Sequence, residues 1–137
     1  MSYVVDASVC AKLFIEEEHS DKATELMSIH ARGGLQLSAP TIVLYELGNV
    51  FWKHPQITHE KAYGFLRRFL DLQINLVDIH SDDNLLKGAC IASKTSDLTF
   101  YDATYMALAE RNGIKLITAD EELHSKAPGI AVLLREF

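Results

Sequence analysis

The sequence predicts an α/β domain in which helices cover both faces of a central, mostly parallel sheet of about five strands, a three-layer α/β/α arrangement. Short apolar runs alternate along the chain with segments whose apolar residues recur at helical spacing, as in parallel sheets joined by helical crossovers. No repeat, low-complexity tract or linker divides the 137 residues, and this length suits one hydrophobic core. We therefore expect residues 1–137 to form a single domain.

The first quarter of the chain predicts a strand, two helices and a second strand. Residues 3–5 are a short β-rich run, and residues 8–15 carry apolar side chains at helical spacing. Ser20 is a good N-cap for the second helix, and the glycine pair that starts at Gly33 supplies the left-handed geometry that ends it. Residues 35–39 form the second predicted strand.

Two consecutive helices are predicted in the middle of the chain. Pro40 suits the first turn of a helix over residues 41–53, because the N–H that proline lacks has no partner there. Pro55 lies just beyond the end of this helix. Thr58 is a good N-cap for the next helix, which extends to about residue 72.

A third strand over residues 75–79 and two more helices follow. Ser81 opens a helix over residues 81–94, whose first turn holds acidic residues that interact favourably with the helix dipole. Thr99 opens a helix over residues 99–112, which stops at an Asn-Gly pair.

The last quarter predicts two strands on either side of a short helix. The strands cover residues 115–119 and 130–134, and the helix covers residues 121–126. In open sheets of this kind, ligands bind outside the carboxyl ends of the strands, where the strand order reverses. We therefore look for a functional site at that edge.

The composition excludes several classes of function. The net charge of −6 argues against a protein that holds nucleic acid by bulk electrostatics, although an acidic site that binds divalent cations reverses its own local sign. No apolar run approaches the roughly 20 residues that cross a bilayer, and Asp6 stands where a signal peptide carries Lys or Arg. We expect a cytoplasmic protein with no membrane partner. Cys10 and Cys90 lack CxxC spacing and are expected to fill core positions.

Two acidic residues directly follow predicted strands. Asp6 follows the run Tyr-Val-Val, and Asp120 follows Leu-Ile-Thr-Ala. Because parallel strands end at one edge of a sheet, both carboxylates are predicted to lie there. Each residue taken alone is a common helix N-cap, so capping is the simplest alternative for either of them.

Glu46 lies in the second turn of a predicted helix, among mostly apolar neighbours such as Val43 and Val50. A carboxylate in such surroundings raises its pKa or finds a cation, and no Lys or Arg lies within one turn of Glu46. Asp102 begins a helix among Tyr101 and Tyr105, so that helix start is expected to be half-buried. If Asp6, Glu46, Asp102 and Asp120 converge, their repulsion calls for cations. Carboxylate oxygens without a nearby His or Cys pair favour Mg²⁺ or Mn²⁺ over Zn²⁺.

These residues resemble the PIN domain nucleases, and most of all the small VapC toxins of VapBC toxin-antitoxin pairs. The resemblance spans nearly the whole chain and is carried by four segments: Val4-Val5-Asp6-Ala7-Ser8, Ala39-Pro40 through Leu44-Tyr45-Glu46-Leu47-Gly48-Asn49, Tyr101-Asp102-Ala103 through Ala107-Leu108-Ala109, and Leu116-Ile117-Thr118-Ala119-Asp120. It implies a PIN-like fold and cleavage of RNA phosphodiester bonds that depends on one or two Mg²⁺ or Mn²⁺ ions. It also implies frequent homodimers and inhibition by a cognate antitoxin protein.

The resemblance assigns roles to individual residues. Asp6, Glu46 and Asp102 match the three core acids of the family and Asp120 matches the fourth, so all four are predicted as catalytic and metal-binding residues. In this assignment Asp6 and Asp102 ligate the metal directly. Glu46 ligates it or orients the attacking water, and Asp120 serves a weaker second ion. Ser8 and Thr118 match hydroxyls that orient the carboxylates.

The substrate-binding residues are the least defined part of this prediction. Four basic residues lie on two consecutive predicted helices and are candidates for phosphate contacts, although a solvated helix face explains them as well: Lys53, Lys61, Arg67 and Arg68. A receiver module or an aspartate-nucleophile phosphatase also places Asp after strand one, but Asp6-Ala7-Ser8 lacks the DxD pattern of the phosphatase. A non-catalytic acidic binding module on the same kind of fold stays as the alternative function.

Overall fold

Five strands form the central sheet in the computed structural model, which describes residues 1–137. They lie in the order β3-β2-β1-β4-β5, and all four neighbouring pairs are parallel. The strands are β1 (Ser2–Val5), β2 (Gln36–Pro40), β3 (Asn75–Val77), β4 (Lys115–Thr118) and β5 (Ala131–Leu133). The prediction of a mostly parallel sheet of about five strands is confirmed.

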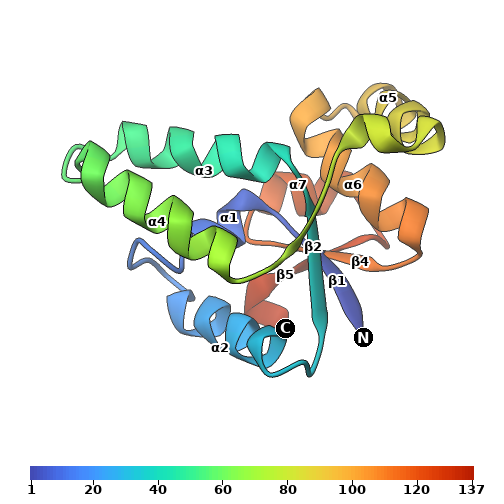
Figure 1. Cartoon of the computed structure of the whole chain (residues 1–137). Helices are drawn as coiled ribbons and strands as arrows, with labels where there is room; N and C mark the ends of the chain where they lie inside the picture. Colours follow the sequence, from blue (N-terminus) through green and yellow to red (C-terminus); the bar gives the residue numbers. More distant parts are fainter.

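Seven helices cover the sheet. Figure 1 shows α1 to α4 on one side of the strands and α5 and α6 on the other, which is the predicted three-layer α/β/α arrangement. The helices are α1 (Ala7–Ala11), α2 (Ser20–Ala31), α3 (Ile42–Lys53), α4 (His59–Asp71), α5 (Asp83–Ser96), α6 (Phe100–Asn112) and α7 (Glu121–Lys126). None of these helices is long and apolar enough to cross a membrane.

The middle strand β1 is buried on both faces, which explains its continuous apolar run. Val4 lies beside Ser38 of β2 and Leu116 of β4, and both Val4 and Val5 are fully buried. Strands covered by helices on both faces carry such runs in place of an alternating pattern. β1 is therefore a rigid platform for the residues that follow it.

Helix α6 packs across the middle of the sheet, in contact with β1, β2 and β4. Every residue from Ala103 to Ala109 is buried, so this helix has no broad solvent-facing stripe in its central turns. A helix that is apolar on all sides belongs in a protein core. The start of α6 lies at the carboxyl edge of the sheet, so burial of the helix also positions Asp102.

Several predicted boundaries were wrong, each for a local reason. Helix α1 ends at Ala11, because the N–H groups of the next residues donate to carbonyls three residues earlier, as in tight turns. Phe14 lies beyond the helix but still packs beside the core. Pro40 ends strand β2, paired with Val77, and does not begin α3. Helix α5 begins at Asp83, capped by Asp82. Cys10 is buried as expected, whereas Cys90 is exposed on α5.

The strand order reverses between β1 and β4. From β1 the chain runs outward through β2 to β3, and then returns to place β4 on the other side of β1. At such a point, the chain leaves the carboxyl ends of the two neighbouring strands in opposite directions, and a crevice opens between the two connections. Asp6 follows one of these strands and Thr118 ends the other.

Candidate functional site

Four separate elements contribute acidic residues to the edge of the sheet where β1 and β4 end. Asp6 is the N-cap of α1, and Asp120 is the N-cap of α7. Glu46 lies in the second turn of α3, and Asp102 lies in the first turn of α6. The four predicted acids therefore come from the two strand ends and from two helices that pack beside them.

Asp6 is 5% exposed, and three donors hold its carboxylate. Its Oδ1 accepts hydrogen bonds from the Ser8 hydroxyl at 2.6 Å and from the Val9 N–H at 3.2 Å. Its Oδ2 accepts one from the Thr118 hydroxyl at 2.5 Å. The Ser8 oxygen also accepts the N–H of Ala119 at 2.9 Å, so α1 and the end of β4 are joined through this carboxylate. Ser8 and Thr118 thus both donate hydrogen bonds to Asp6.

Burial raises the pKa of Asp6 to about 6, against an ordinary value of 3.8. The hydrogen bonds from Ser8, Thr118 and Val9 oppose this rise, and the negative charge of Asp102 adds to it. The ion pairs of the chain involve other acids, so no Lys, Arg or His lies within 4.0 Å of the Asp6 carboxylate. A buried carboxylate without a cation is a place where positive charge binds favourably.

Glu46 is held by a residue that sequence reasoning missed. The hydroxyl of Tyr105 on α6 donates a hydrogen bond of 2.5 Å to Oε1 of Glu46 on α3. Burial raises the pKa of Glu46, and the charge of Asp102 raises it further. Tyr105 itself is 1% exposed. A buried tyrosine hydroxyl needs a partner, but 59 residues separate this pair, so no local pattern could indicate that the partner is Glu46.

Asp102 lies within electrostatic reach of the three other acids. Its pKa is raised, first by burial and then by the charges of Asp120 and Glu122, while Lys126 lowers it by a smaller effect. Asp102 in turn raises the pKa values of Asp6 and Glu46. The predicted acids therefore form one interacting set on one side of the molecule, and Glu122 is an additional acid beside it.

Asp120 is the most exposed of the four acids. Its Oδ1 accepts the N–H groups of Glu122 at 2.9 Å and Leu123 at 3.2 Å, which are the orphan donors at the start of α7. Asp6 also accepts an N–H of the helix that it caps. The helix-capping alternative thus describes the local contacts of both residues, and in each case one carboxylate oxygen makes no contact with the capped helix.

The donor chemistry of this set fits a hard divalent cation. The interacting groups are carboxylates and hydroxyls, with no His or Cys among them, and such oxygen ligands suit Mg²⁺ or Mn²⁺. The acids do not form a complete ligand set by themselves, because no three His, Cys, Asp or Glu side chains in the structure form a group that could hold one ion together. An ion held here would be bound by one or two of the carboxylates and would keep water among its ligands, as Mg²⁺ commonly does.

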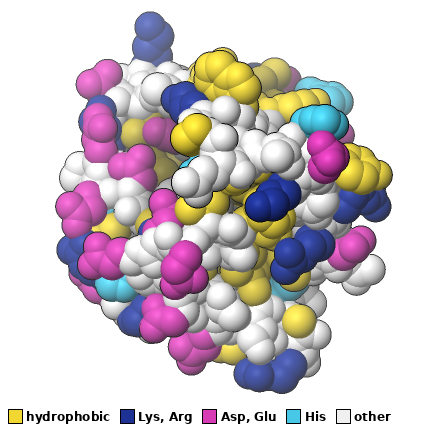
Figure 2. All heavy atoms as spheres, turned by 90° about the vertical axis from the view of Figure 1, so that its left-hand side faces the viewer, with side chains coloured by type: hydrophobic (Ala, Val, Ile, Leu, Met, Phe, Trp, Pro, Cys, Tyr) yellow, Lys and Arg dark blue, Asp and Glu magenta, His cyan; other side chains and the backbone are white.

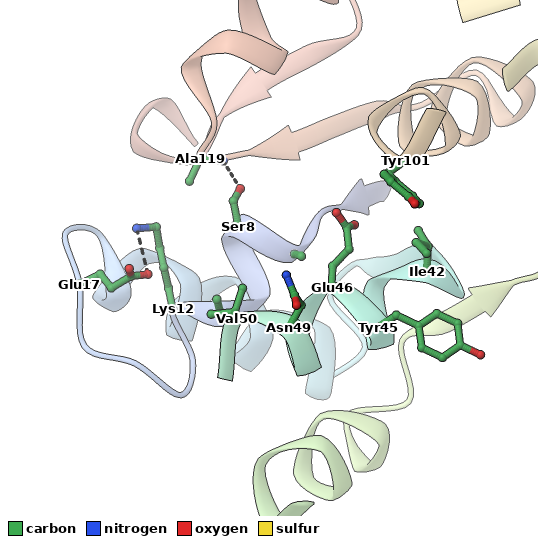
Figure 3. Close-up of a pocket in the computed structure, with 12 residues that line it drawn as sticks. Ser8, Lys12, Glu17, Ile42, Tyr45, Glu46, Asn49, Val50, Tyr101 and Ala119 are labelled. Atoms are coloured by element: carbon green, nitrogen blue, oxygen red, sulfur yellow. Dashed lines mark hydrogen bonds and ion pairs between the residues drawn. The ribbon is translucent and has the colours of Figure 1, made fainter. Parts of the chain in front are cut away.

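A cleft of about 750 Å³ opens beside the acids and is lined by Ser8, Glu46 and Ala119 (Figure 3). Its other lining residues come from α1, α3, the start of α6 and the turn before α2: Ala7, Ala11, Lys12, Glu17, Ile42, Tyr45, Asn49, Val50 and Tyr101. Lys12 is the single basic residue of this lining, and the sequence analysis did not select it. Its place is set by the short helix that also carries Asp6 at its cap.

The four basic residues predicted to grip substrate lie elsewhere. Lys53 ends α3, and Lys61, Arg67 and Arg68 lie on α4. None of them lines the cleft, and the Arg68 guanidinium instead lies over the Phe14 ring at 5.7 Å from its centroid. Figure 2 shows that acidic side chains gather toward one side of this face of the molecule, whereas Lys and Arg are scattered over both sides. The role of these four predicted residues in RNA binding stays a prediction.

Two proteins from Pyrobaculum aerophilum are similar to this chain over nearly its whole length. Ribonuclease VapC3 is 33% identical over 133 residues, which cover 95% of this chain and 98% of the relative. Exonuclease VapC9 is 30% identical over 129 residues, which cover 94% of this chain and 88% of the relative.

A solved structure confirms the fold. A chain of a toxin-antitoxin complex from Klebsiella pneumoniae superposes with a TM-score of 0.70 and 18% identity, covering 96% of this chain and 97% of its own. The family model described as "PIN domain" matches residues 3–128, a range that contains all four acids. The chain therefore belongs to the PIN domain family.

Proposed function

We propose that this protein is a metal-dependent endoribonuclease that hydrolyses RNA phosphodiester bonds and acts as the toxin of a type II toxin-antitoxin pair. The observation that carries the proposal is the acidic set at the end of β1. Asp6, Glu46 and Asp102 come from three elements, and the pKa of each is raised. The negative charge of Asp102 contributes to the rise at both Asp6 and Glu46. None of the three acids forms an ion pair. Such an arrangement is unfavourable unless it binds cations.

In this proposal Asp6 and Asp102 hold Mg²⁺ or Mn²⁺ directly, and Asp120 contributes to a weaker second site. A bound ion of this kind lowers the pKa of water and neutralises charge that develops on a phosphate. Glu46 either joins the ligands or orients the attacking water. These roles follow the resemblance to the family, and the burial and hydrogen bonds of Asp6 support them.

The residues around the acids supply orientation. Ser8 on α1 donates to one oxygen of Asp6 and Thr118 on β4 donates to the other, so the carboxylate has one defined orientation. Tyr105 holds Oε1 of Glu46, which leaves Oε2 free to accept a proton or a hydrogen bond from water. Partners that fix a carboxylate in this way commonly change metal affinity or activity by 10- to 100-fold when they are removed.

The comparisons support the wider proposal in different ways. The relative at 33% identity is named a ribonuclease, and the relative at 30% identity is named an exonuclease, so both names support nuclease chemistry. The structural relative was solved in a toxin-antitoxin complex, and an antitoxin partner for this chain is part of the proposal. We extend the proposal to a homodimer on the family resemblance.

The test is cleavage of a covalently closed circular RNA. The purified protein is incubated with the circle and with the linear form of the same sequence, in Mn²⁺, in Mg²⁺ and in excess EDTA. We expect both substrates to be cut in either metal and neither to be cut in EDTA. Cleavage of the linear RNA alone would show that the enzyme is an exonuclease and not an endonuclease. Cleavage in EDTA equal to that in Mn²⁺ or Mg²⁺ would show that the reaction does not need a metal ion.

A further inference from the structure

Asp102 lines a second cavity, of about 410 Å³, that shares no residue with the cleft beside the acids. The other residues of its lining come from the turn between α5 and α6 and from α7: Asp97, Leu98, Thr99, Glu122, Leu123 and Lys126. Lys126 is the single Lys or Arg of this lining. The second cavity therefore brings one cation to the same space as a member of the acidic set.

Two parts of the chain hold the ammonium of Lys126 in place. Its Nζ donates a hydrogen bond of 2.9 Å to the carbonyl of Asp97, just after α5, and lies 3.8 Å from Oδ2 of the same residue. It also lies 3.1 Å from Oε1 of Glu122, one turn earlier on α7. A lysine side chain is long and flexible, so contacts on both sides are needed to keep its charge beside one cavity.

Lys126 acts on Asp102 without touching it. The two side chains form no ion pair, because the ion pairs of Lys126 are with Asp97 and Glu122. The positive charge nevertheless lowers the pKa of Asp102, and the charge of Asp102 raises the pKa of Lys126. A cation at this range attracts the carboxylate, and it repels any divalent ion that the carboxylate binds, since the two cations carry charge of the same sign.

Glu122 makes the effect of Lys126 larger. Its negative charge raises the pKa of Asp102, by a larger effect than the one with which Lys126 lowers it. Loss of the lysine would remove a positive charge and would also leave Glu122 without its partner. Both changes would make the surroundings of Asp102 more negative and so more favourable for a divalent cation. Loss of Glu122 would have the opposite effect.

A purely structural role accounts for part of this arrangement. A lysine in the last turn of a helix interacts favourably with the helix dipole, and a Glu–Lys pair four residues apart stabilises a helix slightly. Neither effect involves the carbonyl of Asp97 or the cavity shared with Asp102. A structural role also predicts that loss of Lys126 changes stability and leaves metal affinity alone, so the two roles differ in a measurable quantity.

We propose that Lys126 is a built-in counter-ion of the acidic set, which offsets part of the charge of Asp102 and thereby weakens the binding of Mg²⁺ or Mn²⁺ there. This inference rests on the metal site of the proposed function, since it requires that the ion binds at Asp102. It adds that Lys126 raises the concentration of free divalent cation that the protein needs. A nuclease built in this way takes up its metal only at higher concentrations than the four acids alone would require.

Calorimetric titration of the full chain with Mn²⁺, without RNA and at low salt, tests the proposal. Lys126→Gln should bind Mn²⁺ about fivefold more tightly, the order of magnitude for a unit charge that acts on a divalent ion through a solvated cavity. Lys126→Arg keeps the charge and should bind Mn²⁺ like wild type, whereas Glu122→Gln should bind it more weakly. Lys87→Gln is the matched control, because Lys87 pairs with Asp83 at 3.2 Å in the same four-residue spacing on α5 and lines none of the principal cavities.

Salt dependence separates an effect of charge from an effect of shape. Ionic screening shortens the reach of a charge from about 10 Å in about 0.1 M salt to about 3 Å in about 1 M salt. The gain in Mn²⁺ affinity of Lys126→Gln should therefore fall below about twofold in about 1 M KCl. A gain that came from repacking of α7 would be the same at both salt concentrations.

Unchanged or weaker Mn²⁺ binding by Lys126→Gln would overturn the inference, and so would an equal gain in Lys126→Arg or a gain that persists at high salt. Normal Mn²⁺ affinity together with reduced RNA cleavage in Lys126→Gln would also overturn it, and would make the lysine a substrate contact. Failure of the proposed function has a different signature, because the titration contains no RNA. In that case the wild type would leave RNA intact in Mn²⁺, whatever the order of Mn²⁺ affinities among the variants.

Discussion

The hydroxyl of Tyr105 donates a hydrogen bond of 2.5 Å to Oε1 of Glu46 and so joins α6 to α3 across the candidate active site. Glu46 has no neighbouring cation, and the charge of Asp102 raises its pKa. The tyrosine therefore supplies the donor that holds this carboxylate in a crowded acidic environment.

Tyr105→Phe should lower metal-dependent cleavage and Mn²⁺ affinity by about tenfold or more, because the Glu46 carboxylate would lose its fixed orientation. The free energy of unfolding should fall by only about 1 kcal/mol, the usual net loss for one hydrogen bond. Titration calorimetry with Mn²⁺ and urea unfolding measure the two effects. Tyr3→Phe is the control, since the Tyr3 hydroxyl contacts only the Met1 sulfur on the surface. Normal Mn²⁺ affinity in Tyr105→Phe would make the tyrosine a packing residue alone.

Asp6→Asn and Asp102→Asn should each abolish metal-dependent RNA cleavage and leave the circular dichroism spectrum intact. Both changes keep the shape of the side chain and remove the negative charge that a hard cation requires. Asp71→Asn at the exposed end of α4 is a matched control and should cleave like wild type. Retained cleavage in either site variant would end the assignment of these acids.

Thr118→Val should weaken Mn²⁺ binding about 10- to 100-fold, because Oδ2 of Asp6 would lose its only hydrogen bond. The same change should lower the free energy of unfolding by about 1–3 kcal/mol, the cost of leaving a buried acceptor without a partner. Ser8→Ala removes a donor from Oδ1, which keeps the Val9 N–H, so its effect on Mn²⁺ affinity should be smaller. Equal losses of Mn²⁺ affinity in the two variants would show that the two oxygens of Asp6 do not differ in this way.

The metal-free protein should lose stability as the pH rises through the range in which Asp6 ionises. Because burial raises the pKa of Asp6 to about 6, the folded protein keeps a proton that the unfolded chain releases near 3.8. The stability contributed by protonated Asp6 is fully present below about pH 4 and is lost by about pH 6, a difference of about 3 kcal/mol. Urea unfolding in EDTA from pH 4 to 7 should show wild type losing stability relative to Asp6→Asn by this order of magnitude.

Added Mn²⁺ should reverse this trend. Carboxylates bind metal in their deprotonated form, so Mn²⁺ should stabilise wild type more at pH 7 than at pH 5. Thermal unfolding with and without Mn²⁺ at the two pH values measures the difference, and Asp6→Asn should show little stabilisation at either. A larger stabilisation at pH 5 would contradict the placement of the ion at Asp6.

Local patterns in the sequence predicted most of the fold because they report local interactions. The apolar runs and the capping residues Thr58 and Thr99 identify strands and helix starts from a few neighbouring residues. The boundaries that were wrong depended on distant contacts. Pro40 extends β2 because Val77 pairs beside it, and α1 stops early while Phe14 still packs beside the core.

The acids could be selected from sequence because each stands at a recognisable place, after a strand or at a helix start, and in parallel sheets those places meet at one edge. What surrounds them depended on tertiary structure. The partnership of Tyr105 with Glu46 spans 59 residues, and Lys12 reaches the cleft only because α3 and the end of β4 pack around α1. Hydrogen bonds and cleft linings between distant elements depend on how helices pack, and no short stretch of sequence contains that information.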